Sequence, residues 1–402
     1  MWKLEFEEGK RVMTEQNFNV AVVGTGIIGR VHARVSVAHP RLRLVALVDP
    51  VESQREGAAD YVERQLGVDR PAVYSSLADA LADQDIDVVV IGTPSGTHGE
   101  LAEDAVLAGK HVVIEKPLDV SMQRAHRLGD AAADARRRGL VVSVISQHRF
   151  DPANAAVAGA IRNGRFGRLT SATANVSWYR SQEYYDSGDW RGTWELDGGG
   201  ALMNQGVHTV DLLLHFMGTP VQVFAHTALL GHTGIEVEDV AGALVTFESG
   251  AIATLLATTN AFPGMSTRIE VHGSKGSAVV ERDQLAYFHA ADAHPEGTSA
   301  SGQAGNQASR EVGDDDLSQG RPTPELFAGH YRQYDDIVRA ISTGGEPGVG
   351  VADATKALAL VRSVYLSQST GGPVSFADVM DGVYDDLPVV TGSDTAKMEE
   401  LV

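Results

Sequence analysis

The sequence predicts an α/β protein with two domains, a parallel sheet in the N-terminal third and an open, mostly antiparallel sheet in a C-terminal α+β domain. Up to about residue 145, short apolar runs alternate with helical patterns, which is typical of βαβ units. Beyond residue 150, strand-like runs follow one another with turn signals between them, which is typical of hairpins. A chain of 402 residues is long enough for two or three domains.

The N-terminal domain is expected over residues 18–150, after a polar extension over 1–17. Its runs predict strands and helices in alternation: strands over 19–23, 42–48, 88–91, 112–114 and 140–145, and helices over 27–38, 52–66, 98–108 and 121–138. Runs such as VVVI are apolar throughout, as expected of parallel strands that are buried on both faces.

The second domain is expected over residues 151–380, followed by a tail over 381–402. Its predicted strands are 169–178, 221–229, 240–247, 251–259, 268–273 and 277–280, and its predicted helices are 153–161, 206–217, 327–341 and 352–367. The segment 290–324 is rich in Ser, Gly, Ala and Asp and has little apolar periodicity. We therefore expect a mobile loop there.

The charge balance excludes several classes of function. The chain has 33 Lys and Arg against 53 Asp and Glu, a net charge of −20, which argues against a nucleic-acid or membrane partner. It has no cysteine, so disulfides, thiolate metal sites and cysteine nucleophiles are absent. No metal site is expected. No apolar run reaches ~18 residues, and the N-terminus lacks a secretory layout, so we expect a cytoplasmic protein.

A glycine-rich turn predicts a Rossmann-type nucleotide site. In Gly24-Thr25-Gly26-Ile27-Ile28-Gly29, the three glycines permit a tight turn, an approach of the backbone to a pyrophosphate, and close packing of helix on strand. The start of the following helix would offer its free N–H groups to the phosphates. The residues expected to bind the cofactor here are Gly24, Gly26, Ile27, Ile28 and Gly29.

The next strand ends in Asp49, twenty residues after Gly29. A carboxylate at this position accepts a hydrogen bond from the ribose 2′-hydroxyl and would repel a 2′-phosphate. The expected cofactor is therefore NAD in preference to NADP.

Two further stretches follow the carboxyl ends of predicted strands, where ligands of open α/β sheets bind. They are Thr93-Pro94, with His98 close behind, and Glu115-Lys116-Pro117. We expect Thr93, Pro94, His98, Glu115 and Lys116 to line the cofactor site. The Lys116 ammonium could also donate to a substrate oxygen and orient it.

The stretch GGGALMNQGVHTVD, residues 198–211, carries the candidate for proton transfer. If the chain is helical from Asn204, then Asn204, His208 and Asp211 lie at i, i+4 and i+7 on one face. Histidine has a pKa near neutrality, so His208 is a candidate general base. A structural histidine in a helix is the alternative.

Taken together, GTGIIG with Asp49, TPSGTH, EKP and GGGALMNQGVHTVD resemble the Gfo/Idh/MocA oxidoreductases over residues 18–380. The resemblance implies NAD(P)-dependent oxidation of a hydroxyl on a sugar or cyclic polyol, and an open sheet that often carries the oligomer interface, here of a homodimer or homotetramer. It also implies that Lys116 orients the substrate, that His208 is catalytic and that Asp211 closes the motif. Asn204 stands where many members have Asp. Since Asn cannot take a proton, the base role is expected of His208, assisted by Lys116.

Aromatic and arginine side chains before the glycine stretch are the candidates for substrate binding. Tyr179, Arg180, Tyr185 and Trp194 could stack on a sugar ring and bond its hydroxyls, or could pack the sheet and its loops. Arg149 could contact substrate or brace the domain junction. No basic cluster that resembles a phosphate site is evident, so an uncharged pyranoside or cyclitol is preferred. The alternatives are a redox-neutral, NAD-dependent glycosidase and a non-catalytic sugar-sensing regulator.

Overall fold

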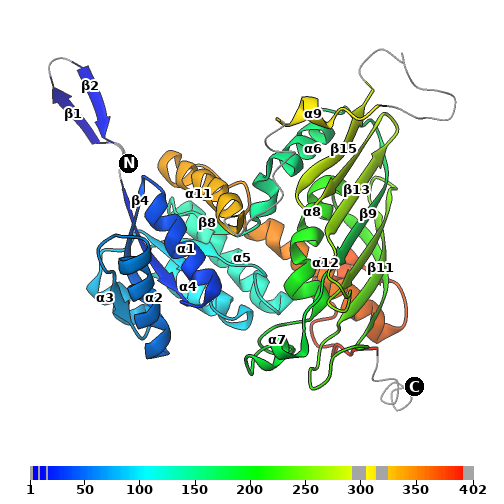
Figure 1. Cartoon of the computed structure of the whole chain (residues 1–402), viewed down its shortest axis with the longest axis horizontal. Coiled ribbons are helices and arrows are strands. Elements are labelled where there is room, and N and C mark those ends of the chain that lie inside the picture. The colour runs from blue at the N-terminus through cyan, green and yellow to red at the C-terminus, as the bar shows by residue number, and fades with distance from the viewer. Residues whose placement is uncertain (1–2, 8–9, 15–16, 292–304, 314–324, 393–402) are drawn as a thin grey trace. The chain divides into compact units, whose positions relative to one another are not determined.

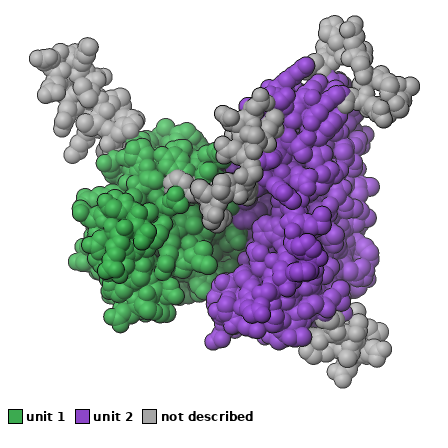
Figure 2. Space-filling view, in the orientation of Figure 1, with its two compact units in different colours: residues 1–119, 124–147, 322–354 green, residues 120–123, 148–321, 355–402 purple. Residues whose placement is uncertain are grey.

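The computed structural model describes residues 3–7, 10–14, 17–291, 305–313 and 325–392 (Figure 1). The chain forms two compact units (Figure 2). Unit 1 comprises residues 1–119, 124–147 and 322–354, and unit 2 comprises residues 120–123, 148–321 and 355–402. Within the described residues, no helix is long and apolar enough to cross a membrane.

Unit 1 contains a six-stranded parallel sheet in the order β5-β4-β3-β6-β7-β8. The strands are β3 (Phe18–Val23), β4 (Leu42–Val48), β5 (Ala72–Tyr74), β6 (Val88–Ile91), β7 (His111–Ile114) and β8 (Val142–Val144). The order runs outward in both directions from β3, which is the Rossmann arrangement and confirms the predicted fold class. The carboxyl ends of β3 and β6 therefore flank the point where ligands of such sheets bind.

The helices of this unit are α1 (Ile27–Ala38), α2 (Glu52–Gln65), α3 (Leu77–Asp83), α4 (His98–Leu107), α5 (Met122–Arg137) and α11 (Glu325–Thr343). α1 lies against β3 and β4, and α11 packs on α1. Tyr334, Ile337, Val338 and Ile341 of α11 join one hydrophobic core with the strands of this sheet. α11 thus belongs to unit 1, although the sequence analysis placed it in the second domain. Its apolar stripe could not show which of two sheets it covers.

Unit 2 contains an eight-stranded sheet in the order β15-β14-β13-β9-β12-β11-β10-β16. All neighbouring pairs are antiparallel except β9 and β12, which confirms the predicted mostly antiparallel sheet. The strands are β9 (Leu169–Ser177), β10 (Pro220–Ala228), β11 (Val240–Phe247), β12 (Ile252–Thr258), β13 (Thr267–Gly273), β14 (Gly276–Glu281), β15 (Gln284–Ala290) and β16 (Val374–Ser375).

Helices cover one face of this sheet, as Figure 1 shows for α6 (Pro152–Arg162), α8 (Val207–Met217) and α12 (Val351–Thr370). The other elements of unit 2 are η2 (Gln147–Phe150), α7 (Gln182–Asp186), the short π-helix η3 (Ala201–Gly206), α9 (Ala308–Glu311) and α13 (Phe376–Met380). Along β10 and β12, side chains alternate between buried and exposed, so the second face of the sheet is open.

Some short elements could not be predicted from the sequence, because two to seven residues carry little periodic signal. They are β5, α3, α7, α9, β15, β16 and α13. The expected polar extension contains an antiparallel hairpin of β1 (Lys3–Glu7) and β2 (Lys10–Thr14). Most of the expected mobile loop 290–324 lies outside the described residues, as does the end of the expected tail over 381–402.

Candidate active site

The glycine turn between β3 and α1 has the shape that a dinucleotide requires. Gly24 has a φ of +85°, and a Cβ there would lie 2.6 Å from the Gly92 carbonyl oxygen. A Cβ on Gly29 would lie 1.9 Å from the Gly24 carbonyl oxygen, so helix and turn pack without side chains between them. By contrast, a Cβ on Gly26 would meet nothing within 4 Å. The space beside Gly26 and the start of α1 therefore fits a pyrophosphate.

Asp49, at the end of β4, is tied to the same turn. Its Oδ2 accepts hydrogen bonds from the Thr25 N–H at 2.9 Å and the Thr25 hydroxyl at 3.0 Å, and its Oδ1 accepts one from the Val51 N–H at 2.9 Å. A carboxylate oxygen has two acceptor positions, so Oδ1 can still receive a ribose hydroxyl. The carboxylate is thus oriented before any ligand binds.

The loops after β6 and β7 are held together by His98, which is buried. Its Nδ1 lies 2.8 Å from the Pro117 carbonyl oxygen and its Nε2 lies 2.9 Å from the Thr93 carbonyl oxygen. Both ring nitrogens thus face backbone carbonyls. His98 therefore fixes the main chain of the two loops, whereas the sequence analysis expected it to contact the cofactor.

Glu115 likewise points into the protein rather than toward the cofactor turn. Its Oε1 lies 3.0 Å from His32 Nε2 and 3.4 Å from His330 Nε2, and its Oε2 accepts the Lys116 main-chain N–H at 3.0 Å. His32 Nδ1 lies 2.8 Å from the Tyr334 hydroxyl. Burial alone would raise the pKa of Glu115, but the hydrogen bonds from His32 and His330 hold it well below its usual range. Burial lowers the pKa of His32.

In unit 2, the helix that carries His208 begins at a turn held by Glu238. Both oxygens of this fully buried carboxylate accept main-chain N–H groups, from Gly200 at 2.8 Å and from Leu202 at 2.8 Å. The Tyr365 hydroxyl donates to the same carboxylate at 3.1 Å. Burial raises the pKa of Glu238 to about 7, and the hydrogen bonds only partly oppose this. A buried acid therefore anchors the π-helix that precedes α8.

Asn204, His208 and Asp211 do not lie on one continuous α-helix, which was the condition for the expected shared face. Asn204 lies in η3, and its Nδ2 donates to Asp197 Oδ1 at 2.5 Å. Asp211, in α8, is buried and accepts two hydrogen bonds from Arg149, at 2.7 and 2.6 Å. The change from π-helical to α-helical spacing at Val207 breaks the regular period that the sequence argument assumed.

His208 packs against a second histidine. The rings of His148 and His208 are 4.9 Å apart and nearly perpendicular. His148 Nδ1 lies 2.8 Å from Asp151 Oδ2 and 3.2 Å from Asp283 Oδ1. Asp283 belongs to the β14–β15 turn and has a φ of +57°. His148 escaped the sequence analysis because its carboxylate partner Asp283 is 135 residues away in the chain.

The aromatic candidates divide into two groups. Tyr185 is buried, its hydroxyl lies 3.1 Å from the Thr259 hydroxyl, and burial raises its pKa to about 12. Trp194 packs edge-on against Tyr365, so both side chains stabilise the fold. Tyr179 is 41% exposed.

Arg180 contacts the π-helix η3. It donates to Gln205 Oε1 at 2.7 Å, and both Arg180 and Arg191 stack on Tyr184. Within the described part of the chain neither guanidinium forms an ion pair with a carboxylate, so each can serve a polar ligand. Arg191 and Tyr184 belong to the same aromatic and arginine stretch that precedes the glycines.

Two histidine–carboxylate groups in the described residues have the spacing of metal ligands. They are His32, Glu115 and His330 in unit 1, and His148, Asp151 and Asp283 in unit 2. Each group includes at least one residue that is distant in the chain, Glu115 and His330 from His32 in one and Asp283 from His148 in the other, so no local motif indicates either group. In each group, a histidine and a carboxylate are also hydrogen-bonded to each other.

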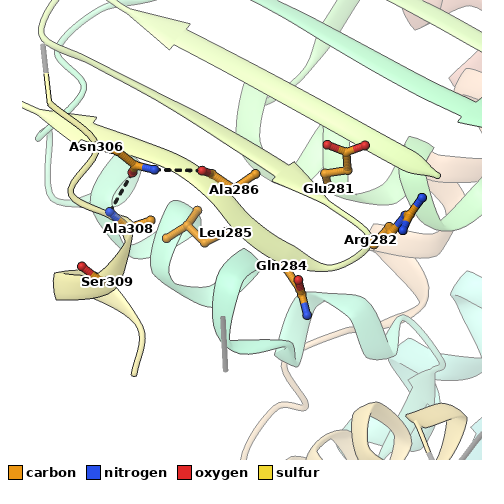
Figure 3. Close-up of a pocket in the computed structure, with 8 residues that line it drawn as sticks. All are labelled: Glu281, Arg282, Gln284, Leu285, Ala286, Asn306, Ala308 and Ser309. Atoms are coloured by element: carbon orange, nitrogen blue, oxygen red, sulfur yellow. Dashed lines mark hydrogen bonds between the residues drawn. The ribbon is translucent and has the colours of Figure 1, made fainter. Parts of the chain in front are cut away.

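A groove of about 640 Å³ opens elsewhere on unit 2, between the β14–β15 turn and α9 (Figure 3). Its polar lining serves the fold. The Asn306 amide donates to the Ala286 carbonyl and its oxygen accepts the Ala308 N–H, and Glu281 is paired with Arg268. None of the residues expected for catalysis or substrate binding lines this groove.

Comparison with known proteins decides the family. Residues 18–145 match the oxidoreductase family with the NAD-binding Rossmann fold, and residues 155–279 match the GFO/IDH/MocA C-terminal domain. The chain belongs to the GFO/IDH/MocA oxidoreductase family. It is therefore an NAD-dependent oxidoreductase, as its glycine turn and Asp49 predicted.

Relatives span most of the chain. The levoglucosan dehydrogenase of Pseudarthrobacter phenanthrenivorans is 30% identical and covers 69% of this chain and 77% of its own length. The inositol 2-dehydrogenase of Rhizobium meliloti is 28% identical over 89% of this chain and 98% of its own. The crystal structure of the WlbA dehydrogenase from Bordetella pertussis, in complex with NADH and UDP-GlcNAcA, superimposes with a TM-score of 0.76. It is 31% identical and covers 90% of this chain and 98% of that one.

Proposed function

We propose that this NAD-dependent oxidoreductase oxidises a ring hydroxyl of a sugar, glycoside or cyclic polyol to a ketone. The observation that carries the proposal is the family membership of a chain that keeps both reactive side chains, Lys116 after β7 and His208 in α8. Relatives named as dehydrogenases of levoglucosan and inositol support this class of substrate. We expect an uncharged pyranoside or cyclitol, because the sequence contains no basic cluster that resembles a phosphate site.

The residues of the chain have distinct roles in this reaction. Bound NAD⁺ supplies the acceptor for the hydride that leaves the carbinol carbon. The open main chain at Gly26 and the carboxylate of Asp49 would hold the phosphates and the ribose of this cofactor. The Lys116 ammonium donates to the substrate oxygen and orients it, and the hydroxyl proton passes to a ring nitrogen of His208. Arg180 donates to other ring hydroxyls.

The first test follows NADH absorbance while cyclitols, free sugars and glycosides are offered with NAD⁺. One substrate class should give NADH, and no class should need added NADP⁺. Lys116→Met and His208→Asn should each lower kcat by about 10²–10⁴-fold while the dissociation constant for NADH stays within about threefold, because neither side chain holds the phosphates. Release of aglycone without NADH would instead identify a redox-neutral glycosidase.

Matched controls separate chemistry from damage to the fold. Lys110 precedes β7 at the end opposite Lys116, and His126 lies in α5, outside the residues expected for catalysis, binding or assembly. Lys110→Met and His126→Asn should keep turnover close to wild type. Near-normal turnover of Lys116→Met or His208→Asn would contradict the assigned roles.

We also propose that the open face of the unit 2 sheet joins copies of this chain into a homodimer or homotetramer. Phe224, Leu244, Ile252 and Leu256 on β10, β11 and β12 are 41–47% exposed, and Phe224 pairs with Leu244 in the register. Leu244→Lys should lower the mass measured by light scattering, whereas Leu107→Lys on unit 1 should not. An unchanged mass for Leu244→Lys would contradict this interface. A cytoplasmic location stays a prediction.

A further inference from the structure

A closed polar cluster lies directly behind Lys116 and has no role in the reaction described above. It joins three elements of unit 1: His32 of α1, Glu115 at the end of β7, and His330 and Tyr334 of α11. His32, His330 and Tyr334 are at most 1% exposed and Glu115 is 3% exposed. Burying so many polar groups costs free energy unless they satisfy one another, so their arrangement has to be specific.

Chemistry fixes the direction of each hydrogen bond in the cluster. An ionised carboxylate can only accept, so His32 Nε2 donates to Glu115 Oε1. Burial lowers the pKa of His32, and in its neutral ring Nδ1 is then an acceptor for the Tyr334 O–H. The other oxygen, Oε2, receives the main-chain N–H of Lys116. One continuous chain of donors thus runs from α11 through α1 to the carboxylate that holds Lys116.

We propose that Glu115 is a positioning residue for Lys116, with His32, His330 and Tyr334 holding its carboxylate in place. The inference rests on the proposed function, which gives Lys116 its role toward the substrate oxygen. Glu115 fixes the main chain from which the ammonium extends. Through His32 it ties that main chain to α1, whose first turn is expected to face the phosphates of the cofactor. The opposite side of the same segment is held by His98 at the Pro117 carbonyl.

The decisive experiment is a double-mutant cycle between Glu115 and Lys116. Glu115→Gln keeps the size of the side chain but replaces one carboxylate oxygen by an NH₂ group, which can only donate, so either the histidines or the Lys116 N–H lose their acceptor. It should lower kcat by about 10–100-fold, as loss of an outer hydrogen-bond partner commonly does, with the dissociation constant for NADH within about threefold. In the Lys116→Met background, measured in single turnovers at high enzyme concentration, the same change should have no further effect.

Matched variants on the same two helices test whether the effect passes through the cluster. His39, the C-cap residue of α1, pairs with Asp335 of α11 at 3.2 Å and forms no hydrogen bond or ion pair with Glu115, so His39→Gln should leave kcat unchanged. His32→Gln retains a donor toward Glu115 and should keep more turnover than His32→Leu. If Glu115→Gln does not fold, Tyr334→Phe removes only the outermost hydroxyl and should lower kcat by about two- to fivefold.

Each outcome decides between explanations. Wild-type kcat in Glu115→Gln, or losses that multiply in the double variant, would overturn the positioning role. An equal loss in His39→Gln would show that only helix packing had been disturbed. Stoichiometric zinc or manganese in the purified protein, lost on His32→Leu, would make the cluster a metal centre instead. If Lys116→Met itself turns over normally, the proposed function fails, whereas an inactive Lys116→Met with an active Glu115→Gln refutes the positioning role alone.

Discussion

Two buried glutamates, Glu115 in unit 1 and Glu238 in unit 2, lie next to the segments that carry Lys116 and His208. Their pKa values are shifted in opposite directions. Glu115 lies behind Lys116 among two histidines, which hold its pKa well below the usual range although burial alone would raise it. Glu238 lies behind the turn that leads to His208, where burial dominates and raises its pKa to about 7. Its partners are two main-chain N–H groups and a tyrosine hydroxyl.

The difference shows that partners, more than burial, decide whether an enclosed acid is charged. The His32 and His330 side chains donate hydrogen bonds to the Glu115 carboxylate, which favours its ionised form. Main-chain amides supply dipoles but no compensating charge, so the desolvation of Glu238 is only partly offset. Glu115 in unit 1 therefore stays ionised near neutral pH, whereas Glu238 in unit 2 changes its protonation state there.

The largest expected effect comes from Gly200→Ala, which tests whether Glu238 dictates the turn. A Cβ at Gly200 would lie 1.8 Å from the Glu238 carbonyl oxygen, so the main chain would have to move. We expect a loss of about 2–4 kcal/mol in the free energy of unfolding and a large loss of kcat, because the π-helix leading to His208 shifts. Thermal denaturation and initial rates measure the two effects.

Gly129→Ala is the matched control for this substitution. Gly129 lies within α5, and a Cβ there would meet nothing within 4 Å. Removing a glycine from a helix interior should raise stability by about 0.5–1 kcal/mol and leave kcat unchanged. If Gly200→Ala were equally harmless, the close approach of Glu238 would not constrain the turn.

The next effect is a pH dependence from Glu238. Its pKa is about 7 in the folded protein and 4.5 in the unfolded chain, so the folded state binds this proton more tightly. Its contribution to stability is complete below about pH 4.5 and is lost as the pH rises through about 7. The change is at most ~3.5 kcal/mol, from about 1.4 kcal/mol per pKa unit. The free energy of unfolding, measured with denaturant across pH 5–9, should fall more steeply with pH for wild type than for Glu238→Gln. Parallel curves for the two proteins would show that Glu238 does not titrate in this range.

The smallest effect, confined to acid pH, has the opposite sign and comes from Glu115. Its folded-state pKa lies below the unfolded value of 4.5, so its stabilisation is present above that pH and is lost as the pH falls through the folded-state value. Glu115→Gln should therefore flatten the acid limb of the stability curve and leave the limb above pH 7 unchanged. A changed alkaline limb in this variant would show that the two acids are coupled.

The sequence alone was sufficient for much of the fold and for the nucleotide turn. Helix 27–38 and strands 42–48, 88–91 and 240–247 were predicted with the bounds that the structure has. These elements are encoded locally, by apolar period and by glycines at positions that no other residue can take. The role of Asp49 followed in the same way, since it depends on a spacing along one βαβ unit.

Tertiary structure alone decided how the reactive side chains are supported. Glu115 and His98 were expected at the cofactor, yet each is directed to groups far away in the sequence or to loop carbonyls. Asn204 and Asp211 were expected on one α-helix, yet Asn204 lies in a π-helix and donates to Asp197, whereas Asp211 lies in α8 and accepts from Arg149. Sequence motifs and apolar periodicity reflect only contacts between residues that are close together in the chain. The partner of a buried polar group is chosen by which distant elements pack beside it, and no local pattern records that choice.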